Sequence, residues 1–299
     1  MAMTRGKIIA LVIVGAGIFF MAVVFAIIFA VSQSSSDFAV GGIGGKIALV
    51  EVDGVIKDSD DIVRQIKKYK EDHSIQAIVL RVDSPGGGVA ASQEIYDQLL
   101  KFKSDGRHII VSMGSVAASG GYYVSCAADT IFANPGTITG SIGVIFEFPI
   151  LQELMDKVGV KMEVIKSGAL KDVGNPDRKM TPEEQKMLQS VIDDTYDQFV
   201  TVVAKNRHLD YNFVKGLADG SVFTGRQAMQ NGLVDKMGTL EDAISAAGVI
   251  CNLGEHPRVV KERLYMVPWW QAIAGKLGLD FINSNFIHQW PTLEYRYEM

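Results

Sequence analysis

Two glycine-rich turns contain the residues of this sequence best suited to chemistry. The run M-G-S-V-A-A-S-G-G-Y-Y at 113–123 places Ser119 directly before Gly120, and the run D-S-P-G-G-G occupies 83–88. A serine at a strand-to-helix turn is a candidate nucleophile, and glycine N–H groups are accessible donors because no Cβ covers them. On this interpretation Ser119 attacks a carbonyl, and the N–H groups of Gly86 and Gly120 form the oxyanion hole.

The same residues also fit a purely structural interpretation. Serine commonly caps the N-terminus of a helix, and Ser-Gly-Gly and Pro-Gly-Gly are common turn sequences. The turn at 83–88 is no phosphate-binding loop, because the G-K-[ST] ending is missing. Spacing alone therefore leaves both a nucleophile and a helix cap open for Ser119.

A nucleophilic serine needs a base, and the histidines offer none in a suitable place. His108 begins a predicted strand and should lie at the opposite end of the sheet from Ser119. The others lie near polar helix ends or in an irregular tail: His73, His208, His256 and His288. A lysine can replace histidine where burial favours its neutral form. Lys171, in K-S-G-A-L-K-D, has small or apolar neighbours, although the adjacent Asp172 favours a solvated amine and Lys166 competes for the role.

The elements that must position these residues alternate between strand and helix. Apolar runs predict buried strands, and amphipathic runs between them predict helices. The predicted strands are 47–52, 77–82 and 108–113, and the predicted helices are 60–69 and 91–102. This alternation predicts an α/β domain with a mostly parallel sheet, whose carboxyl edge receives both glycine turns.

Two further elements are predicted around the candidate lysine. The run K-M-E-V-I-K at 161–166 is predicted as a strand. The run T-P-E-E that follows predicts a helix start, with Thr181 as the N-cap and Glu184 closing a capping box. We expect that helix to continue to about Asn206.

The N-terminal part has a different composition from the rest. Residues 8–31 are uncharged and long enough to cross a bilayer as a helix. Arg5 and Lys7 precede this anchor, so the positive-inside rule places the N-terminus in the cytoplasm and the remainder outside. A signal peptide cut after Ala30 is the alternative, but the apolar run is longer than such segments usually are.

These patterns predict five consecutive parts. They are a cytoplasmic N-terminus at 1–7, a transmembrane anchor at 8–31, a flexible linker at 32–45, a catalytic domain at 46–248 and a C-terminal extension at 249–299. The linker is predicted from its serine and glycine content, which is too poor in core residues to pack.

Composition excludes several classes of protein. The chain has 299 residues, of which 48% are hydrophobic and 21% charged, so it is long enough for one large or two small folded domains. A net charge of −5 with scattered lysines and arginines argues against nucleic acid as a partner. Cys126 and Cys251 form neither a disulfide framework nor a zinc site, so we expect no metal and no cofactor. Cys126 is predicted to serve packing.

Four motifs, in this order, resemble the short-form family of bacterial signal peptide peptidase A. They are R-V-D-S-P-G-G-G-V, G-S-V-A-A-S-G-G-Y-Y-V-S, N-P-G-T-I-T-G-S-I-G-V-I and K-S-G-A-L-K-D, within about residues 46–245. The resemblance implies a Clp-protease/crotonase-like fold of repeated ββα units and a serine-lysine peptidase that cuts residual signal peptides in or near the membrane. It also implies a homo-oligomeric ring in which serine and lysine come from neighbouring subunits.

Carried over motif by motif, the resemblance assigns a role to each candidate. Ser119 is the nucleophile, Lys171 is the general base, and Ser141 of T-G-S-I-G orients that lysine. Gly86 and Gly120 supply the oxyanion hole.

The surroundings of these residues carry further expectations. We expect the neighbours of the lysine to exclude water and keep the amine neutral. These neighbours are Gly168, Ala169, Leu170 and Val173. Asp83 and Asp172 are candidates for structural hydrogen bonds. Substrate peptides are expected to bind by strand addition, with small or apolar side chains in shallow pockets.

Two other functions fit the same fold. One is a crotonase-type acyl-CoA hydratase or isomerase, against which stand the external location and the lack of an acid-base carboxylate in the turns. The other is a non-catalytic membrane scaffold.

The C-terminal extension keeps two interpretations open. Trp269, Ile273 and Leu277 share one helical face, which fits a membrane-surface or subunit contact as well as a cover for the core. The aromatic end W-P-T-L-E-Y-R-Y-E-M is predicted to lie over a neighbouring subunit or near the catalytic groove.

Overall fold

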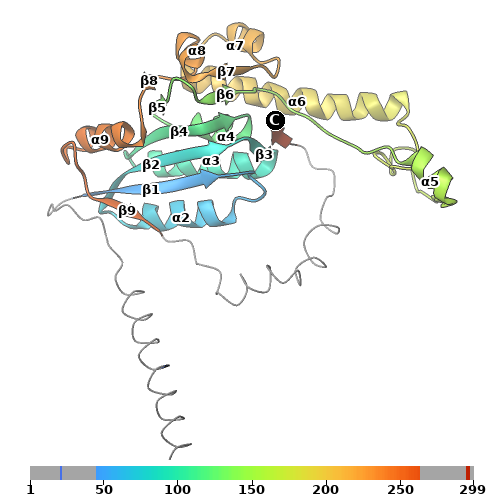
Figure 1. The fold of residues 1–299 in the computed structure, drawn as a ribbon, viewed down its shortest axis with the longest axis horizontal. Helices are drawn as coiled ribbons and strands as arrows, with labels where there is room; N and C mark the ends of the chain where they lie inside the picture. Colours follow the sequence, from blue (N-terminus) through green and yellow to red (C-terminus); the bar gives the residue numbers. More distant parts are fainter. Residues whose placement is uncertain (1–20, 22–44, 263–293, 297–299) are drawn as a thin grey trace, which may run out of the picture. The chain divides into compact units, whose positions relative to one another are not determined.

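The structure, a computed structural model, describes Met21, residues 45–262 and residues 294–296 (Figure 1). The predicted anchor at 8–31 lies outside the described residues apart from Met21, which is helical, and so does the linker apart from Gly45. The helical face predicted for Trp269, Ile273 and Leu277 also lies outside them. Within the described ranges, no helix is both long and apolar enough to cross a bilayer.

A mostly parallel sheet forms the centre of the fold, with strands in the order β7-β6-β4-β2-β1-β9 and with β5 and β8 attached beside β4. Of the pairings among the described strands, that of β6 with β7 is antiparallel and the others in this sheet are parallel. The strands are β1 (Lys46–Asp53), β2 (Ile75–Ser84), β4 (His108–Ala118), β5 (Thr130–Ala133), β6 (Ile138–Gly140), β7 (Val222–Thr224), β8 (Lys236–Met237) and β9 (Val259–Lys261). The prediction of an α/β domain with a mostly parallel sheet is confirmed.

Helices cover both faces of this sheet because side chains alternate along each strand. Ile47 of β1 joins a small core with Ala243 and Ala247 of α9, whereas Ala48 and Val50 join the larger core on the other face. The helices are α2 (Asp60–Glu71), α3 (Val89–Lys103), α4 (Gly120–Ser125), α5 (Gln152–Val158), α6 (Pro182–Arg207), α7 (Tyr211–Leu217), α8 (Gly225–Gln230) and α9 (Leu240–Ile250). Residues of α2, α3, α4 and α6 line the larger core.

The long helix α6 begins as predicted. Thr181 Oγ1 accepts the N–H of Glu184 at 3.2 Å, and the Glu184 carboxylate accepts the N–H of Thr181 at 2.8 Å, which completes the capping box. From Thr195 onward α6 contributes buried side chains, whereas in its first half only Glu184 is buried. Figure 1 accordingly shows the first half of α6 extending past the sheet, with α5 near its free end.

Three features differ from the sequence predictions or extend them. The prediction of a strand at 161–166 is wrong. These residues have no regular structure and are exposed, because no described strand lies beside them to pair with. β4 continues to Ala118, so most of M-G-S-V-A-A-S-G-G-Y-Y is strand and not turn. α9 runs across the predicted domain boundary at 248, and β9, from the predicted C-terminal extension, pairs with β1 at the sheet edge.

A second, two-stranded sheet lies at the end of β2. β3 (Gly86–Gly88) pairs there with the antiparallel strand β10 (Glu294–Arg296) near the end of the chain. The predicted C-terminal extension therefore contributes a strand to each of the two sheets.

Candidate active site

β4 and β6 bring Ser119 and Ser141 to one edge of the sheet. Ala118 pairs with Gly140, so each serine directly follows its strand's last paired residue. The Ser119 N–H donates to the Gly140 carbonyl at 2.8 Å, and the Ser141 N–H donates to the Ser221 carbonyl at 2.8 Å. Two of the predicted site residues therefore lie on neighbouring strand ends.

Ser119 has an uncommon backbone conformation, and its side chain does not cap the helix that follows. Its φ of 52° and ψ of −115° lie in a region that residues with a Cβ rarely adopt. The side chain makes no capping hydrogen bond to α4, and its Oγ hydrogen-bonds to nothing in the described part of the chain. Ser119 therefore occupies the N-cap position of α4, and its carbonyl accepts the Tyr123 N–H at 2.8 Å, but its hydroxyl does not cap the helix.

A bulge in β4, held by Asp83, sets where Ser119 lies. Val82 pairs with Met113 but Ser84 pairs with Ala117, so β4 has extra residues opposite Asp83. The Asp83 carboxylate accepts the N–H of Val116 at 3.0 Å. The structural hydrogen bond expected of Asp83 is confirmed, and it shapes the strand end that carries the serine.

The glycines of β3 approach the turn after Ser119 closely. A Cβ built on Gly86 would lie 2.6 Å from the nitrogen of Gly120, so the two turns can meet only without that side chain. Gly86 also has a φ of +102°, which disfavours any other residue. The structure therefore brings Gly86 and Gly120 together beside Ser119.

The N–H groups of this glycine turn point in different directions. The Gly86 N–H is already donated to Ser84 Oγ at 3.1 Å. On one side of β3, Ile56 donates to the Gly86 carbonyl and accepts from the Gly88 N–H, both at 2.8 Å. Because peptide groups alternate in direction along a strand, the Gly87 N–H points to the opposite side, toward β10.

Gly87 is thus a candidate donor that sequence reasoning missed. Three adjacent glycines offer three N–H groups, and only the pairing of β3 distinguishes them. One local pattern could have indicated that the Gly86 N–H already has an acceptor. Serine side chains often accept the N–H of the residue two positions later, as Ser84 does from Gly86.

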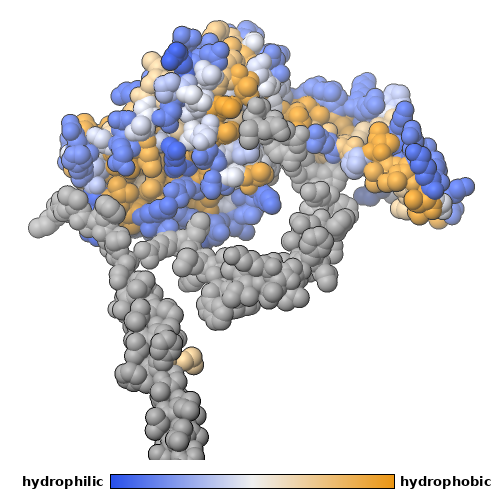
Figure 2. Space-filling view, in the orientation of Figure 1, coloured by the Kyte–Doolittle hydropathy of each residue, from blue (hydrophilic) through white to orange (hydrophobic). Residues whose placement is uncertain are grey.

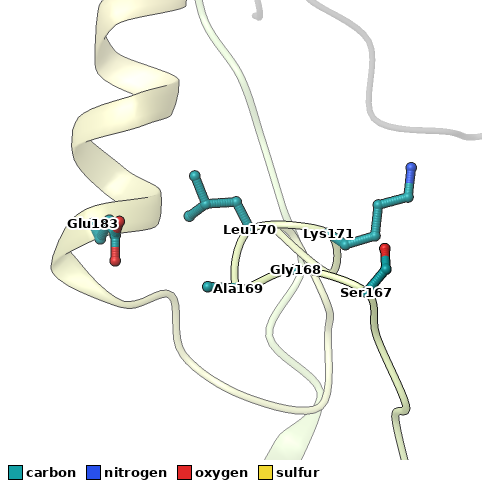
Figure 3. A pocket seen from close by; sticks show the side chains of 6 residues that line it. All are labelled: Ser167, Gly168, Ala169, Leu170, Lys171 and Glu183. Atoms are coloured by element: carbon teal, nitrogen blue, oxygen red, sulfur yellow. The ribbon is translucent and has the colours of Figure 1, made fainter.

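Lys171 lies in a different setting, on an exposed turn (Figure 3). Its side chain extends away from Leu170 and Glu183, which line the same shallow hollow. Gly168 and Ala169 are exposed as well, so the expectation that the neighbours of Lys171 exclude water is wrong for the single chain.

Asp172 organises the turn that holds Lys171. Its carboxylate binds Lys166 and, at 2.9 Å, Arg178, and these hydrogen bonds, first that of Lys166, hold the pKa of Asp172 below its ordinary value. Lys166 also donates to the Ala169 carbonyl at 3.0 Å. The structural role expected of Asp172 is confirmed, and the competing amine of Lys166 is occupied, whereas Lys171 forms no ion pair with any described residue.

The chain does not bring Lys171 to Ser119. Lys171 lines the same hollow as Glu183, at the start of α6, whereas Phe199 of the same helix packs against Tyr123, four residues after Ser119. From Glu183 to Phe199 the helix advances about 24 Å at its usual rise. Within the described chain, the serine and the lysine therefore belong to separate places.

The segment that carries Lys171 exposes many apolar side chains, which gather over α5 in Figure 2. No residue from 143 to 183 is buried. Ile165 is 96% exposed, and the other large apolar side chains exposed here are Ile150, Leu151, Leu154, Val158, Val160, Met162 and Val164. An exposed apolar surface of this kind is typical of a contact with another protein or with a membrane.

The remaining candidates for chemistry lie away from Ser119 or are inert. His108 begins β4, so β4 separates it from Ser119 by about 30 Å. Burial raises the pKa of Cys126 to about 12, which leaves a protonated thiol in the core. The prediction that Cys126 serves packing is confirmed.

Comparison with known proteins identifies relatives of this arrangement. The model of peptidase family S49 matches residues 101–253, and that of Clp protease matches residues 48–137. "Putative protease slr0021" of Synechocystis is 47% identical over 209 residues, 70% of this chain and 75% of that protein. "Putative signal peptide peptidase SppA" of Enterococcus faecium is 42% identical over 219 residues, 69% of this chain and 64% of that protein.

A longer protein shares the same region. "Protease 4" of Haemophilus influenzae is 38% identical over 216 residues, 69% of this chain but 35% of that protein. The chain thus spans most of the first relative and about a third of this one.

Proposed function

The chain belongs to peptidase family S49, and from this premise we propose that it is a membrane-anchored serine endopeptidase in which Ser119 is the nucleophile and Lys171 the general base. Family membership makes the chain a serine peptidase; the residues that carry the reaction and its place in the cell are our proposal.

The conformation of Ser119 carries the assignment of the nucleophile. A buried serine at a strained φ of 52°, whose hydroxyl has no partner among the described residues, has no evident stabilising purpose. The nearby N–H groups of Gly87 and Gly120 suit an oxyanion, while Gly86 allows the two turns to approach. A reacting carbonyl between these turns would lie beside the serine.

We assign the base to Lys171 of a neighbouring subunit. In its own chain this amine is exposed and about a helix length away from Ser119. The apolar segment at 150–165 would be covered if it packed on a second copy. Such an interface would also desolvate the amine, and loss of water favours the neutral form that a general base needs.

The reaction then follows a serine-lysine course. The neutral Lys171 amine takes the proton of Ser119 Oγ as Oγ attacks the peptide carbonyl, and the Gly87 and Gly120 N–H groups hold the developing oxyanion. The lysine returns the proton to the leaving amine, and water releases the acyl group by the same steps. Ser141, next to Ser119 in register, orients the lysine amine through its hydroxyl.

The proposed substrate and the proposed cellular location of the protein are supported by its sequence and by the name of one relative. The apolar run at 8–31 would anchor the chain with its catalytic domain outside the cytoplasm. A relative bears the name signal peptide peptidase. We therefore propose cleaved signal peptides left in the bilayer as substrates.

Co-expression of two inactive variants tests the shared site. Ser119→Ala and Lys171→Ala should each abolish cleavage of a fluorogenic peptide. Mixed rings should regain about a quarter of the activity, because random assembly pairs an intact serine with an intact neighbouring lysine at that frequency. No recovery in rings shown to contain both variants would place the dyad within one chain, and activity in either single variant would refute the dyad itself.

The acyl-CoA enzyme and the scaffold make different predictions. Both matched family models describe proteases, which disfavours an acyl-CoA enzyme. A scaffold would assemble normally but would not be labelled by a serine-directed acylating reagent. Labelling of Ser119, located by mass spectrometry and increasing with pH, supports a peptidase with a lysine base, because the neutral fraction of the amine grows with pH.

A further inference from the structure

Two buried serines connect the glycine turn of β3 to the start of α4. Ser84 ends β2 and Ser92 lies in the first turn of α3, and both side chains are fully buried. Neither residue belongs to the proposed dyad or to the proposed oxyanion donors. Because serine is mostly an exposed residue, the partners of a fully buried hydroxyl indicate its role.

Each serine holds one end of the glycine turn by a hydrogen bond. Ser84 Oγ accepts the Gly86 N–H at 3.1 Å, and Ser92 Oγ donates to the Gly88 carbonyl at 2.9 Å. The proposed donor between these two points is the N–H of Gly87. It is therefore flanked on both sides by peptide groups that a buried side chain holds in place.

The same two serines lie against the glycines that begin α4. A Cβ built on Gly120 would lie 2.6 Å from Ser92 Oγ, and one built on Gly121 would lie 2.8 Å from the Ser84 carbonyl oxygen. Ser92 thus contacts the residue of the second proposed oxyanion donor, and it also hydrogen-bonds to the turn that carries the first. Through these contacts the two proposed donors share a common support.

A glycine turn needs such a support because glycine has more backbone freedom than any other residue. Gly86 and Gly87 have φ of +102° and +154°, and glycine can leave such conformations at little steric cost. An oxyanion hole lowers the barrier when its N–H groups point at the developing charge before the reaction begins. Hydrogen bonds from buried side chains supply that preorganisation.

We propose that Ser84 and Ser92 are positioning residues that hold the Gly87 and Gly120 N–H groups in the geometry that the oxyanion requires. The inference rests on the proposed function and adds two residues to the same site. Both hydroxyls act through the glycines and do not touch the reacting atoms. Loss of either hydroxyl should therefore weaken binding of the transition state more than binding of the substrate.

Steady-state kinetics of the full-length Ser84→Ala and Ser92→Ala proteins test this role. Each substitution should lower kcat for a fluorogenic peptide by about tenfold, because N–H groups that lie out of position stabilise the oxyanion less. KM should stay within about twofold of the wild-type value, because the contacts to the bound substrate are kept. An unchanged kcat in both variants would overturn the proposal.

Ser125→Ala is the matched control for Ser92→Ala. Ser125 is also a fully buried helical serine that donates to the carbonyl four residues earlier, which is that of Gly121 at 2.7 Å. Both substitutions should lower the melting temperature by a few degrees, because each removes one buried hydrogen bond. Ser125→Ala should keep the wild-type kcat. An equal loss of kcat in these two variants would mean that Ser92 serves only the fold.

A peptide boronic acid separates this inference from the proposed reaction. Its boron accepts the Ser119 oxygen and becomes a negatively charged tetrahedral centre, which resembles the oxyanion intermediate. Its affinity should fall by about tenfold in Ser84→Ala and in Ser92→Ala. The affinity of the matching peptide amide, measured by fluorescence anisotropy with Ser119→Ala added to each variant, should not change.

The outcomes of this binding experiment are distinct. No loss of boronic acid affinity, or equal losses for the boronic acid and the amide, would overturn the positioning role and leave the proposed reaction intact. The absence of an adduct at Ser119 of the wild-type protein, read by mass spectrometry, would refute the proposed reaction together with this inference.

Discussion

The regions around Ser119 and Lys171 are built in opposite ways. Ser119 follows a central strand, is 1% exposed and has neighbours fixed by sheet register. The segment at 143–183 contains one short helix and no buried residue. Contacts within the segment include the Leu151 N–H donated to the Pro176 carbonyl at 2.7 Å and the stacked rings of Phe146 and Phe148.

This difference shows that the fold of one chain positions Ser119 and the glycine turns of the proposed site but does not bring Lys171 to them. Ser119 and the glycine turns proposed to hold the oxyanion are positioned by a core that one chain forms by itself. The lysine is carried on a segment without buried residues, which we propose is covered by a second subunit. Substitutions in the two regions should therefore have different effects. Those near Ser119 should impair catalysis or folding, and those near Lys171 should impair assembly.

The largest expected effect separates a catalytic serine from a structural one. Ser119→Ala should lower kcat by about a thousandfold or more while changing the free energy of unfolding by less than about 0.5 kcal/mol. Ser125→Ala removes a buried hydrogen bond of 2.7 Å to the Gly121 carbonyl and should cost about 1 kcal/mol while sparing activity. Peptide assays and denaturant unfolding measure both; a strongly destabilised Ser119→Ala would mean that the hydroxyl serves the fold.

The next effect concerns the glycine turn. Gly86→Ala places a Cβ against Gly120 and against the path of the substrate carbonyl, so activity should fall by about a hundredfold. Gly54→Ala is the control, because Gly54 has a similar positive φ of +67° but open space around it. It should cost about 1 kcal/mol of stability and leave kcat unchanged. Equal loss of activity in both variants would attribute the effect to backbone strain.

Assembly should depend on the apolar surface of the lysine segment. Ile165→Asp should shift the protein to smaller species in light scattering and reduce activity by about tenfold, because Ile165 is 96% exposed in the single chain and is proposed to be covered in the ring. Val249→Asp, at a side chain 56% exposed on α9, is the control and should change neither property. An intact, active ring of the Ile165→Asp variant would remove this surface from the interface.

Sequence reasoning predicted what local patterns determine. Strand and helix alternation follows from hydrophobic period, and the capping box of Thr181 and Glu184 follows from four consecutive residues. It also identified Ser119 as a candidate, because a serine flanked by small residues at a strand-to-helix turn has an accessible hydroxyl.

What it missed depends on pairing between distant segments. The directions in which the N–H groups of β3 point are set by its pairing with Ile56 and with β10, which no local pattern reveals. The run at 161–166 has the composition of a strand. An apolar run becomes a strand only where it can pair with the edge of a sheet. The exposure of Lys171 likewise depends on which surfaces meet, so its small neighbours were a misleading sign of burial.

The smallest expected effect tests how the lysine segment is attached to α6. Arg178 binds the Glu184 carboxylate and, with the N–H of Thr181, holds the pKa of Glu184 at about 2, below its ordinary 4.5. Because the folded-state pKa is lowered, this stabilisation is present above pH 4.5 and is lost as the pH falls toward 2. Glu184→Gln keeps a capping side chain but removes the charge, so its melting temperature should fall by a few degrees at pH 7 and converge with that of the wild-type protein near pH 2. The neighbouring, exposed Glu183→Gln is the matched control and should follow the wild-type curve across this range. Parallel curves for Glu184→Gln and the wild type would show that the ion pair does not attach the segment, and that the lysine turn is positioned by its contacts in the ring alone.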